Sequence, residues 1–202
     1  MPAPENLPVL IPDPAALMAL VEELVNRPWP RSDEDRDELF ELLGFSSGDE
    51  FDPDRADSTT KLFALNTALG GDVFAGWAAH DGHFMGINLQ PYGSIKPDNP
   101  DTRRGYDDVR ARLTALYGEP ANAWADGQLP PCIWTVNGRQ ITMHFFNRRH
   151  SGMLLSVDDA EIAAASEIES REAAKNRVLP PELVAAKEAI EEEERRRNYP
   201  EG

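Results

Sequence analysis

Four apolar residues near the N-terminus repeat with the spacing of a single helical face: Leu17, Leu20, Val21 and Leu24. Asp13 precedes them as an N-cap, and Pro14 stands at the first helical position, where its missing N–H is not needed. The pattern predicts a first helix that ends before Pro28.

A second helical period follows at Leu39, Phe40, Leu42 and Leu43. Ser32 can cap its first turn, and the acidic residues 33–35 complement the positive end of the helix dipole. Gly44 stands where a left-handed C-cap residue is expected. These signals predict a second helix between Ser32 and Gly44.

After this helix the period shortens to that of β-strands. Three largely apolar segments, 59–66, 72–80 and 83–90, are separated by glycines at 70–71 and by Asp-Gly at 81–82. Asp-Gly between two such segments is a strong signal for a type I′ hairpin. We expect three antiparallel strands here.

The second half of the chain repeats this order. A loop rich in Pro and Asp (91–103) precedes a helical face that ends at Gly118 and comprises Val109, Leu113, Leu116 and Tyr117. Three more strand-like segments follow at 132–137, 138–146 and 153–157, the first two joined by an Asn-Gly turn. Each set of three strands holds one tryptophan, Trp77 or Trp134, which leaves an internal duplication open.

The order of elements predicts an α+β fold: an antiparallel sheet of five or six strands with helices packed on one face and a helical C-terminal tail. Fifteen of the 16 aromatic residues lie in 1–158, and only Tyr199 lies beyond. We therefore expect one domain over 1–158 and a charged helical tail, partly solvated or disordered, over 159–202.

Charge and composition narrow the function. The 202 residues include 36 acids and 20 bases, a net charge of −16, which argues against nucleic-acid binding. The chain starts without a signal-peptide pattern and contains no apolar run of about 20 residues, so we expect no membrane association. Cys132 is the only cysteine, which suits a reducing compartment and a cytoplasmic protein.

Three partial motifs resemble catalytic or metal-binding sites, but each lacks a residue or structural element that such a site requires. Residues 44–48 match the G-x-S-x-G nucleophile elbow, but a helix precedes Ser46 where a strand is required. Residues 49–57 space oxygens like a calcium loop without its glycine and glutamate. His80 and His83 face each other across a turn without further ligands and are predicted to be surface residues. We expect no catalytic residue, no metal and no cofactor.

The strongest functional signal is an acidic stretch. Residues 33–57 hold 11 acids and two bases, a field that would steer a basic protein partner. A specific interface also needs an aromatic anchor, and Phe51 and Trp124 are the candidates. The predicted partner-binding residues are Asp49, Glu50, Phe51, Asp52, Asp54, Asp57 and Trp124.

The segments LFELLGF, LYGEPANAW and IWTVNGRQITMHF resemble small acidic bacterial immunity-type proteins of polymorphic toxin systems, over about residues 25–145. The resemblance implies a cytoplasmic protein that binds and neutralises a cognate toxin, and it carries over no individual functional residue. The order of elements also resembles acidic secretion chaperones, which hold a segment of a partner; an enzyme is the third alternative. The sequence leaves the partner and the oligomeric state open.

Overall fold

The computed structural model describes residues 8–51, 58–122 and 131–176. The chain divides into two compact units, residues 1–166 and 167–202. The whole β-sheet and three of the four described helices belong to the first unit. None of the helices in the described ranges is long and apolar enough to cross a membrane.

The first two helices begin and end where local sequence predicts. Helix α1 spans Pro14–Asn26, and the Asp13 carboxylate accepts a hydrogen bond from the Ala15 N–H at 2.8 Å. Helix α2 spans Asp33–Leu43 and is capped by the Ser32 hydroxyl. It ends at Gly44, whose φ of 68° gives the left-handed conformation that glycine adopts without strain.

The third helix starts earlier than its hydrophobic pattern indicates. Helix α3 spans Pro100–Tyr117, so its first turn occupies the end of the segment predicted as a loop over 91–103. The Asn99 side chain accepts hydrogen bonds from the N–H groups of Asp101 and Thr102, at 3.1 and 3.0 Å. The predicted loop is also shortened at its start, because the preceding strand runs to Ser94.

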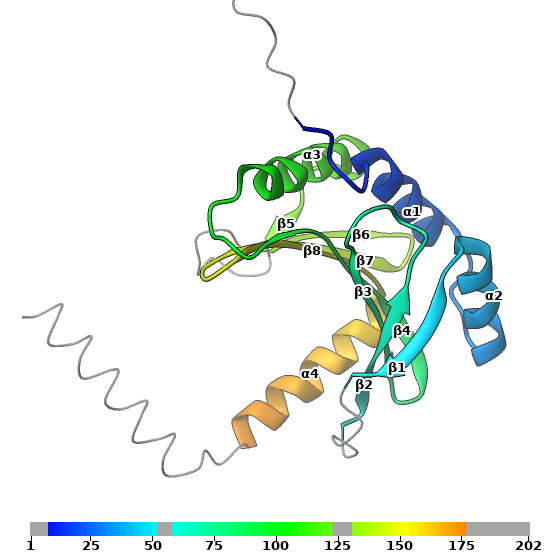
Figure 1. The fold of residues 1–202 in the computed structure, drawn as a ribbon. Coiled ribbons are helices and arrows are strands. Elements are labelled where there is room, and N and C mark those ends of the chain that lie inside the picture. The colour runs from blue at the N-terminus through cyan, green and yellow to red at the C-terminus, as the bar shows by residue number, and fades with distance from the viewer. Residues whose placement is uncertain (1–7, 52–57, 123–130, 177–202) are drawn as a thin grey trace, which may run out of the picture. The chain divides into compact units, whose positions relative to one another are not determined.

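In the described ranges the sheet is antiparallel and has eight strands instead of the predicted five or six. The strands are β1 (Ser46–Glu50), β2 (Thr60–Asn66), β3 (Phe74–His80), β4 (His83–Ser94), β5 (Ala121–Asn122), β6 (Cys132–Val136), β7 (Arg139–Asn147) and β8 (Ser151–Asp159). The two additional strands, β1 and β5, are the outermost ones (Figure 1). Neither carries an alternating hydrophobic pattern, since β1 has the sequence SSGDE and β5 has only two residues.

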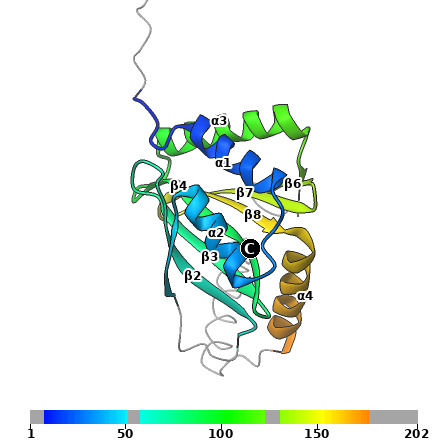
Figure 2. The ribbon, with the colours of Figure 1, turned by 90° about the vertical axis from the view of Figure 1, so that its right-hand side faces the viewer.

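The two faces of the sheet differ. Helices α1, α2 and α3 cover one face, and the residues that point toward them form the hydrophobic core (Figure 2). Trp77, Ile87 and Val157 are neighbours across three adjacent strands and are all buried in this core. Residues that alternate with them point to the opposite face, which we call the open face.

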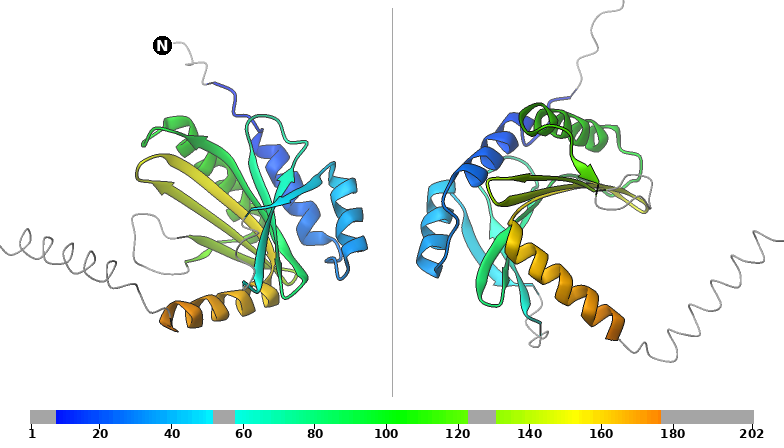
Figure 3. Two further views of the ribbon diagram at one scale, coloured as in Figure 1. Left: turned by 60° about the horizontal axis from the view of Figure 1, so that its bottom comes forward. Right: turned by 180° about the vertical axis from the view of Figure 1, so that it is seen from behind.

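The chain order gives the sheet a repeated plan. The strand order is β1-β2-β3-β4-β8-β7-β6-β5 (Figure 3). The four strands that follow α2 form one half of the sheet and the four that follow α3 form the other, and the halves meet where β4 pairs with β8. The two tryptophans do not occupy matching positions in this plan. Trp77 lies on the third strand of its half, and Trp134 lies on the second.

Helix α4, Ala160–Asn176, runs from the first unit into the second. Within the first unit the Asp159 carboxylate caps its first turn and lies 3.4 Å from the Arg139 guanidinium. The hydroxyls of Thr60 and Ser166 are 2.9 Å apart. The predicted domain boundary after residue 158 therefore falls one residue before the end of β8.

These contacts predict the result of truncation. A chain that ends at Ser166 is expected to unfold cooperatively with nearly the melting temperature of the full chain. A chain that ends at Asp158 loses the Asp159 and Ser166 contacts, each worth about 1 kcal/mol, so its melting temperature should be lower by several degrees. Circular dichroism on both truncations checks this, and equal melting temperatures would show that the segment 159–166 contributes nothing to the first unit.

Candidate functional site

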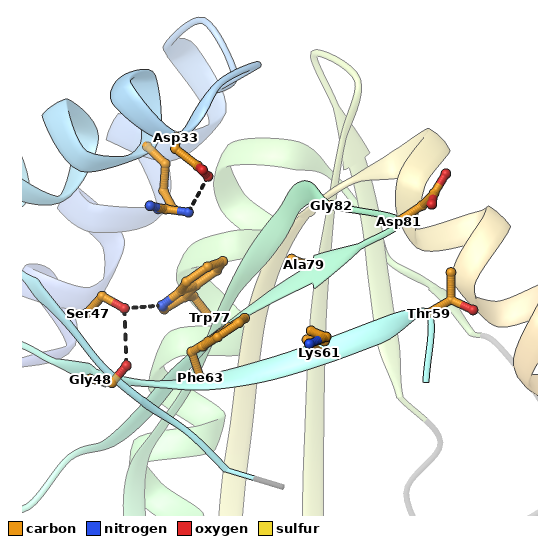
Figure 4. Close-up of a pocket in the computed structure, with 11 residues that line it drawn as sticks. Asp33, Ser47, Gly48, Thr59, Lys61, Phe63, Trp77, Ala79, Asp81 and Gly82 are labelled. Atoms are coloured by element: carbon orange, nitrogen blue, oxygen red, sulfur yellow. Dashed lines mark hydrogen bonds and ion pairs between the residues drawn. The ribbon is translucent and has the colours of Figure 1, made fainter. Parts of the chain in front are cut away.

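A shallow groove of about 580 Å³ lies between α2 and the β1, β2 and β3 strands (Figure 4). Its wall on the helix side includes Asp33 and Arg36, and β1 contributes Ser47 and Gly48. Strands β2 and β3 supply the remaining wall, which includes Lys61, Phe63 and Trp77. The groove thus adjoins the edge of the sheet.

An aromatic and cationic stack holds one wall of the groove in place. The Phe63 ring lies parallel to the Trp77 indole, with centroids 4.1 Å apart. The Arg36 guanidinium lies 4.7 Å from the centroid of the Trp77 ring and forms ion pairs with Asp33 and Asp37 at 2.6 and 2.8 Å. The Trp77 Nε1–H donates to the Ser47 hydroxyl at 2.8 Å. Arg36 is therefore neutralised within the protein.

Acidic side chains gather on the solvent side of α2. Five exposed residues share one continuous arc of the helix, which we call the acidic face of α2: Asp33, Glu34, Asp37, Glu38 and Glu41. Asp33 and Asp37 bind Arg36, and among the described residues the other three form no ion pair. Their charge is available to a partner.

Part of the acidic stretch 33–57 forms a strand that the sequence did not predict. Asp49 and Glu50 belong to β1, whereas the sequence pattern predicted no strand before residue 59. Asp49 is exposed, whereas Glu50 is half-buried and lies 3.6 Å from the Lys61 ammonium group. Of these two predicted partner-binding carboxylates, only Asp49 is unpaired among the described residues.

Phe51 lies next to β1 and is exposed, as an interface anchor must be. Its side chain is 46% exposed and stacks on Phe74, which is 61% exposed, with ring centroids 5.5 Å apart. A Cβ on Gly76 would come within 3.1 Å of the Phe51 ring, so the absence of a side chain there lets the ring lie on the sheet. The exposed Leu62 also points to the open face, so this corner of the sheet presents apolar surface to solvent.

The other predicted partner-binding residues, Asp52, Asp54, Asp57 and Trp124, lie outside the described residues. The sequence had no signal for Phe74 as the partner of Phe51. In the sequence, Phe74 lies in a segment predicted to be a strand and has no feature that links it to Phe51. The contact between the two rings depends on the pairing of β1, β2 and β3.

The structure places one of the two predicted surface histidines at the surface and buries the other. His80 and His83 are opposite each other in the register of β3 and β4. His83 is exposed, but His80 is buried, and its Nδ1 is 2.9 Å from the Thr60 hydroxyl, so the prediction of a surface residue is wrong for His80. In the described ranges no three His, Cys, Asp or Glu side chains come together as a metal site requires.

Ser46 does not occupy a nucleophile elbow. It begins β1 two residues after the left-handed Gly44 that ends α2, so the order is helix and then strand. Its hydroxyl accepts a hydrogen bond from the Asn66 amide at 3.3 Å. The strained turn that raises a serine nucleophile between a strand and a helix is not formed here.

A buried carboxylic acid on the open face has no counterpart among the predicted sites. Asp158 is 8% exposed, its Oδ2 accepts a hydrogen bond from the Ser156 hydroxyl at 2.8 Å, and its Oδ1 has no hydrogen-bond partner among the residues that the structure describes. Burial raises the pKa of Asp158 to about 7, and the hydrogen bond from Ser156 acts in the opposite direction. Gly86 on the neighbouring strand leaves the space that this carboxyl fills.

Comparison with known proteins adds no relative. No protein-family model, no curated protein and no solved structure matches this chain. Function is therefore inferred from the residues of the site: free carboxylates on the acidic face of α2, and the exposed Phe51–Phe74 pair beside the edge strand β1.

Proposed function

We propose that this chain is a protein-binding module that recognises a basic partner at the β1 edge of its sheet. The observation that carries the proposal is the exposed, stacked Phe51–Phe74 pair beside the edge strand β1, which carries the exposed and unpaired Asp49. Exposed aromatic rings cost free energy in an isolated protein and are typical of interaction sites. Carboxylates without internal partners favour a basic surface opposite them.

The two features have different roles in binding. The acidic face of α2 and Asp49 attract a basic partner over a distance and so raise the association rate, an effect that salt screens. Phe51 and Phe74 supply apolar area that is removed from water in the complex and so slow dissociation. Charge alone would bind weakly, and apolar surface alone would not select for a basic partner.

Within this class we favour an immunity-type protein that binds and neutralises a basic toxin. The resemblance of three segments to such proteins and the net charge of −16 support this choice. The open face of the sheet supports a second candidate, a secretion-chaperone-like protein that holds a partner segment, because Leu62, Phe51 and Phe74 present apolar surface on that face. The two candidates differ in whether the acidic face of α2 is required.

Binding kinetics test the proposal. The partner is captured from the native host with the full chain and identified, and its association is measured with the variant E34K/E38K/E41K. We expect association to slow about tenfold or more at low salt, with a weaker dependence on salt. Phe51→Ala should instead speed dissociation, at a cost of about 2 kcal/mol.

The matched control is E22K/D72K/E119K, which makes the same change in net charge at three exposed acids away from α2 and β1. It should leave both rates close to those of the unmodified protein. If E34K/E38K/E41K and this control behave alike, the acidic face of α2 is not a docking surface. If E34K/E38K/E41K binds the partner normally while Phe51→Ala does not, the secretion-chaperone-like protein is the favoured candidate.

A further inference from the structure

Among the strands that the structure describes, β1 is at one edge of the sheet. It pairs with β2 on one side, and in the described part of the chain no strand pairs with its other side. The backbone groups along a sheet edge are a template for another extended segment. Proteins often prevent pairing at a sheet edge with charged side chains or bulges. The charge and polarity of the side chains around β1 therefore determine which segment can pair with it.

The side chains of β1 lie in two different surroundings, and an irregular register between Ser47 and Glu50 interrupts their alternation. Ser47 points to the helix-covered face, where its hydroxyl binds the Trp77 indole, and Glu50 lies opposite Phe63 on the same side. Gly48 points to the open face, where a Cβ would meet the Ala64 side chain at 2.9 Å, and Phe51 follows it there. Successive side chains of a regular strand placed beside β1 would point in turn to these two surroundings.

A strand added to β1 would therefore meet two different surfaces. Its side chains on the helix-covered side would enter the groove, where Asp33, at one end of the acidic face of α2, lies beside Ser47 and Gly48. Its side chains on the other side would lie on the open face beside Phe51 and Phe74. Basic residues fit the first surface and apolar residues the second.

We propose that β1 binds an extended segment of a basic partner as a ninth strand, with basic side chains toward the acidic face of α2 and apolar side chains toward Phe51 and Phe74. This inference rests on the proposed function and specifies its binding mode. The segment is one in which basic and apolar residues alternate. Such a pattern has the period of a strand that is amphipathic about the plane of the sheet.

Charge excludes a second copy of this chain as the occupant. Two copies paired through β1 would bring two Asp49 side chains and two acidic α2 faces together, and each copy carries a net charge of −16. Repulsion between these like charges disfavours a dimer formed through β1. The irregular register between Ser47 and Glu50 also limits pairing to a short segment. The edge is thus protected against self-association and remains open to a basic strand.

Synthetic peptides test the proposal with the full chain. The probe is a short capped peptide in which arginine alternates with valine, and its control has the same composition with the arginines and valines in two blocks. We expect the alternating peptide to bind at least about tenfold more tightly and to protect backbone amides of β1 from hydrogen exchange, as followed by NMR. Equal binding of the two peptides, or binding without protection of β1, would overturn strand addition.

Methylation of backbone nitrogens in the peptide tests whether one particular edge of the peptide pairs with β1. Along a strand, residues whose side chains share a face also direct their N–H groups to the same edge. Methylating the valine nitrogens blocks one edge of the peptide, and methylating the arginine nitrogens blocks the other. One of these two peptides should lose binding about tenfold or more while the other binds like the parent. If both bind like the parent, no strand is added.

The outcome separates this inference from the proposed function. If the alternating and block peptides bind equally, and E34K/E38K/E41K weakens both while E22K/D72K/E119K does not, acidic docking stands and strand addition is wrong. If E34K/E38K/E41K binds both peptides as the unmodified chain does, the acidic face of α2 has no role and both proposals fail.

Discussion

Replacing Asp158 with asparagine is expected to stabilise the protein above pH 7 by on the order of 4 kcal/mol. The Asp158 carboxyl is buried, and burial raises its pKa from 3.8 to about 7. Between these two values the folded state holds a proton that the unfolded state has released. The free energy of unfolding therefore falls as the pH rises from about 4 to 7 and is constant above that range. Asparagine does not ionise and avoids this loss.

Urea unfolding of both proteins between about pH 5.5 and 8.5 measures the effect, away from the isoelectric point near 4.6. The advantage of Asp158→Asn should grow by about 2 kcal/mol between pH 5.5 and 7 and then stay level. Asp72→Asn replaces an exposed carboxylate and serves as the control, with no such growth. An advantage of Asp158→Asn that is the same at every pH would show that the carboxyl is not buried in the folded protein.

The sequence was sufficient to predict the helix starts and turns that are determined by a few neighbouring residues. Asp13 and Ser32 begin helices because their own side chains accept hydrogen bonds from the next turn. The Asp81-Gly82 turn forms because both residues adopt positive φ, 50° and 76°. Such features depend on a few neighbouring residues, and the sequence contains all of them.

Features that depend on distant pairing could not be predicted. β1, with the sequence SSGDE, has no hydrophobic alternation, and it is a strand because it pairs with β2. The contact between Phe51 and Phe74 follows from that pairing across three strands. The acidic and aromatic character of the site was visible in the sequence at Asp49 and Phe51, but its second aromatic residue was not.

The burial of Asp158 is non-local in the same way. Its segment, MLLSVDD, shows only that a strand approaches its end, and an acid in that position is typically exposed. In the structure Asp158 lies opposite Gly86 of β4, and the missing side chain of that glycine leaves room for the carboxyl. A glycine in the middle of a strand is the one signal in the sequence that indicates a close approach.

That close approach predicts the effect of a single methyl group. A Cβ at Gly86 would lie 2.6 Å from the Val157 carbonyl oxygen and 2.8 Å from the Asp158 Cα, both backbone atoms of the central strand β8. Because backbone cannot move aside as a side chain can, Gly86→Ala must separate β4 from β8. We expect a loss of about 3 kcal/mol in the free energy of unfolding.

Gly93→Ala is the matched control in the same strand. The nearest atoms to a Cβ at Gly93 are 3.8 and 4.0 Å away, and its φ is not positive, so alanine fits without strain. Alanine also loses less backbone entropy on folding than glycine does, so Gly93→Ala should be neutral or stabilising by about 0.5–1 kcal/mol. Urea unfolding of the two variants should therefore give changes of opposite sign. Equal changes would mean that the spacing between β4 and β8 does not require glycine at position 86.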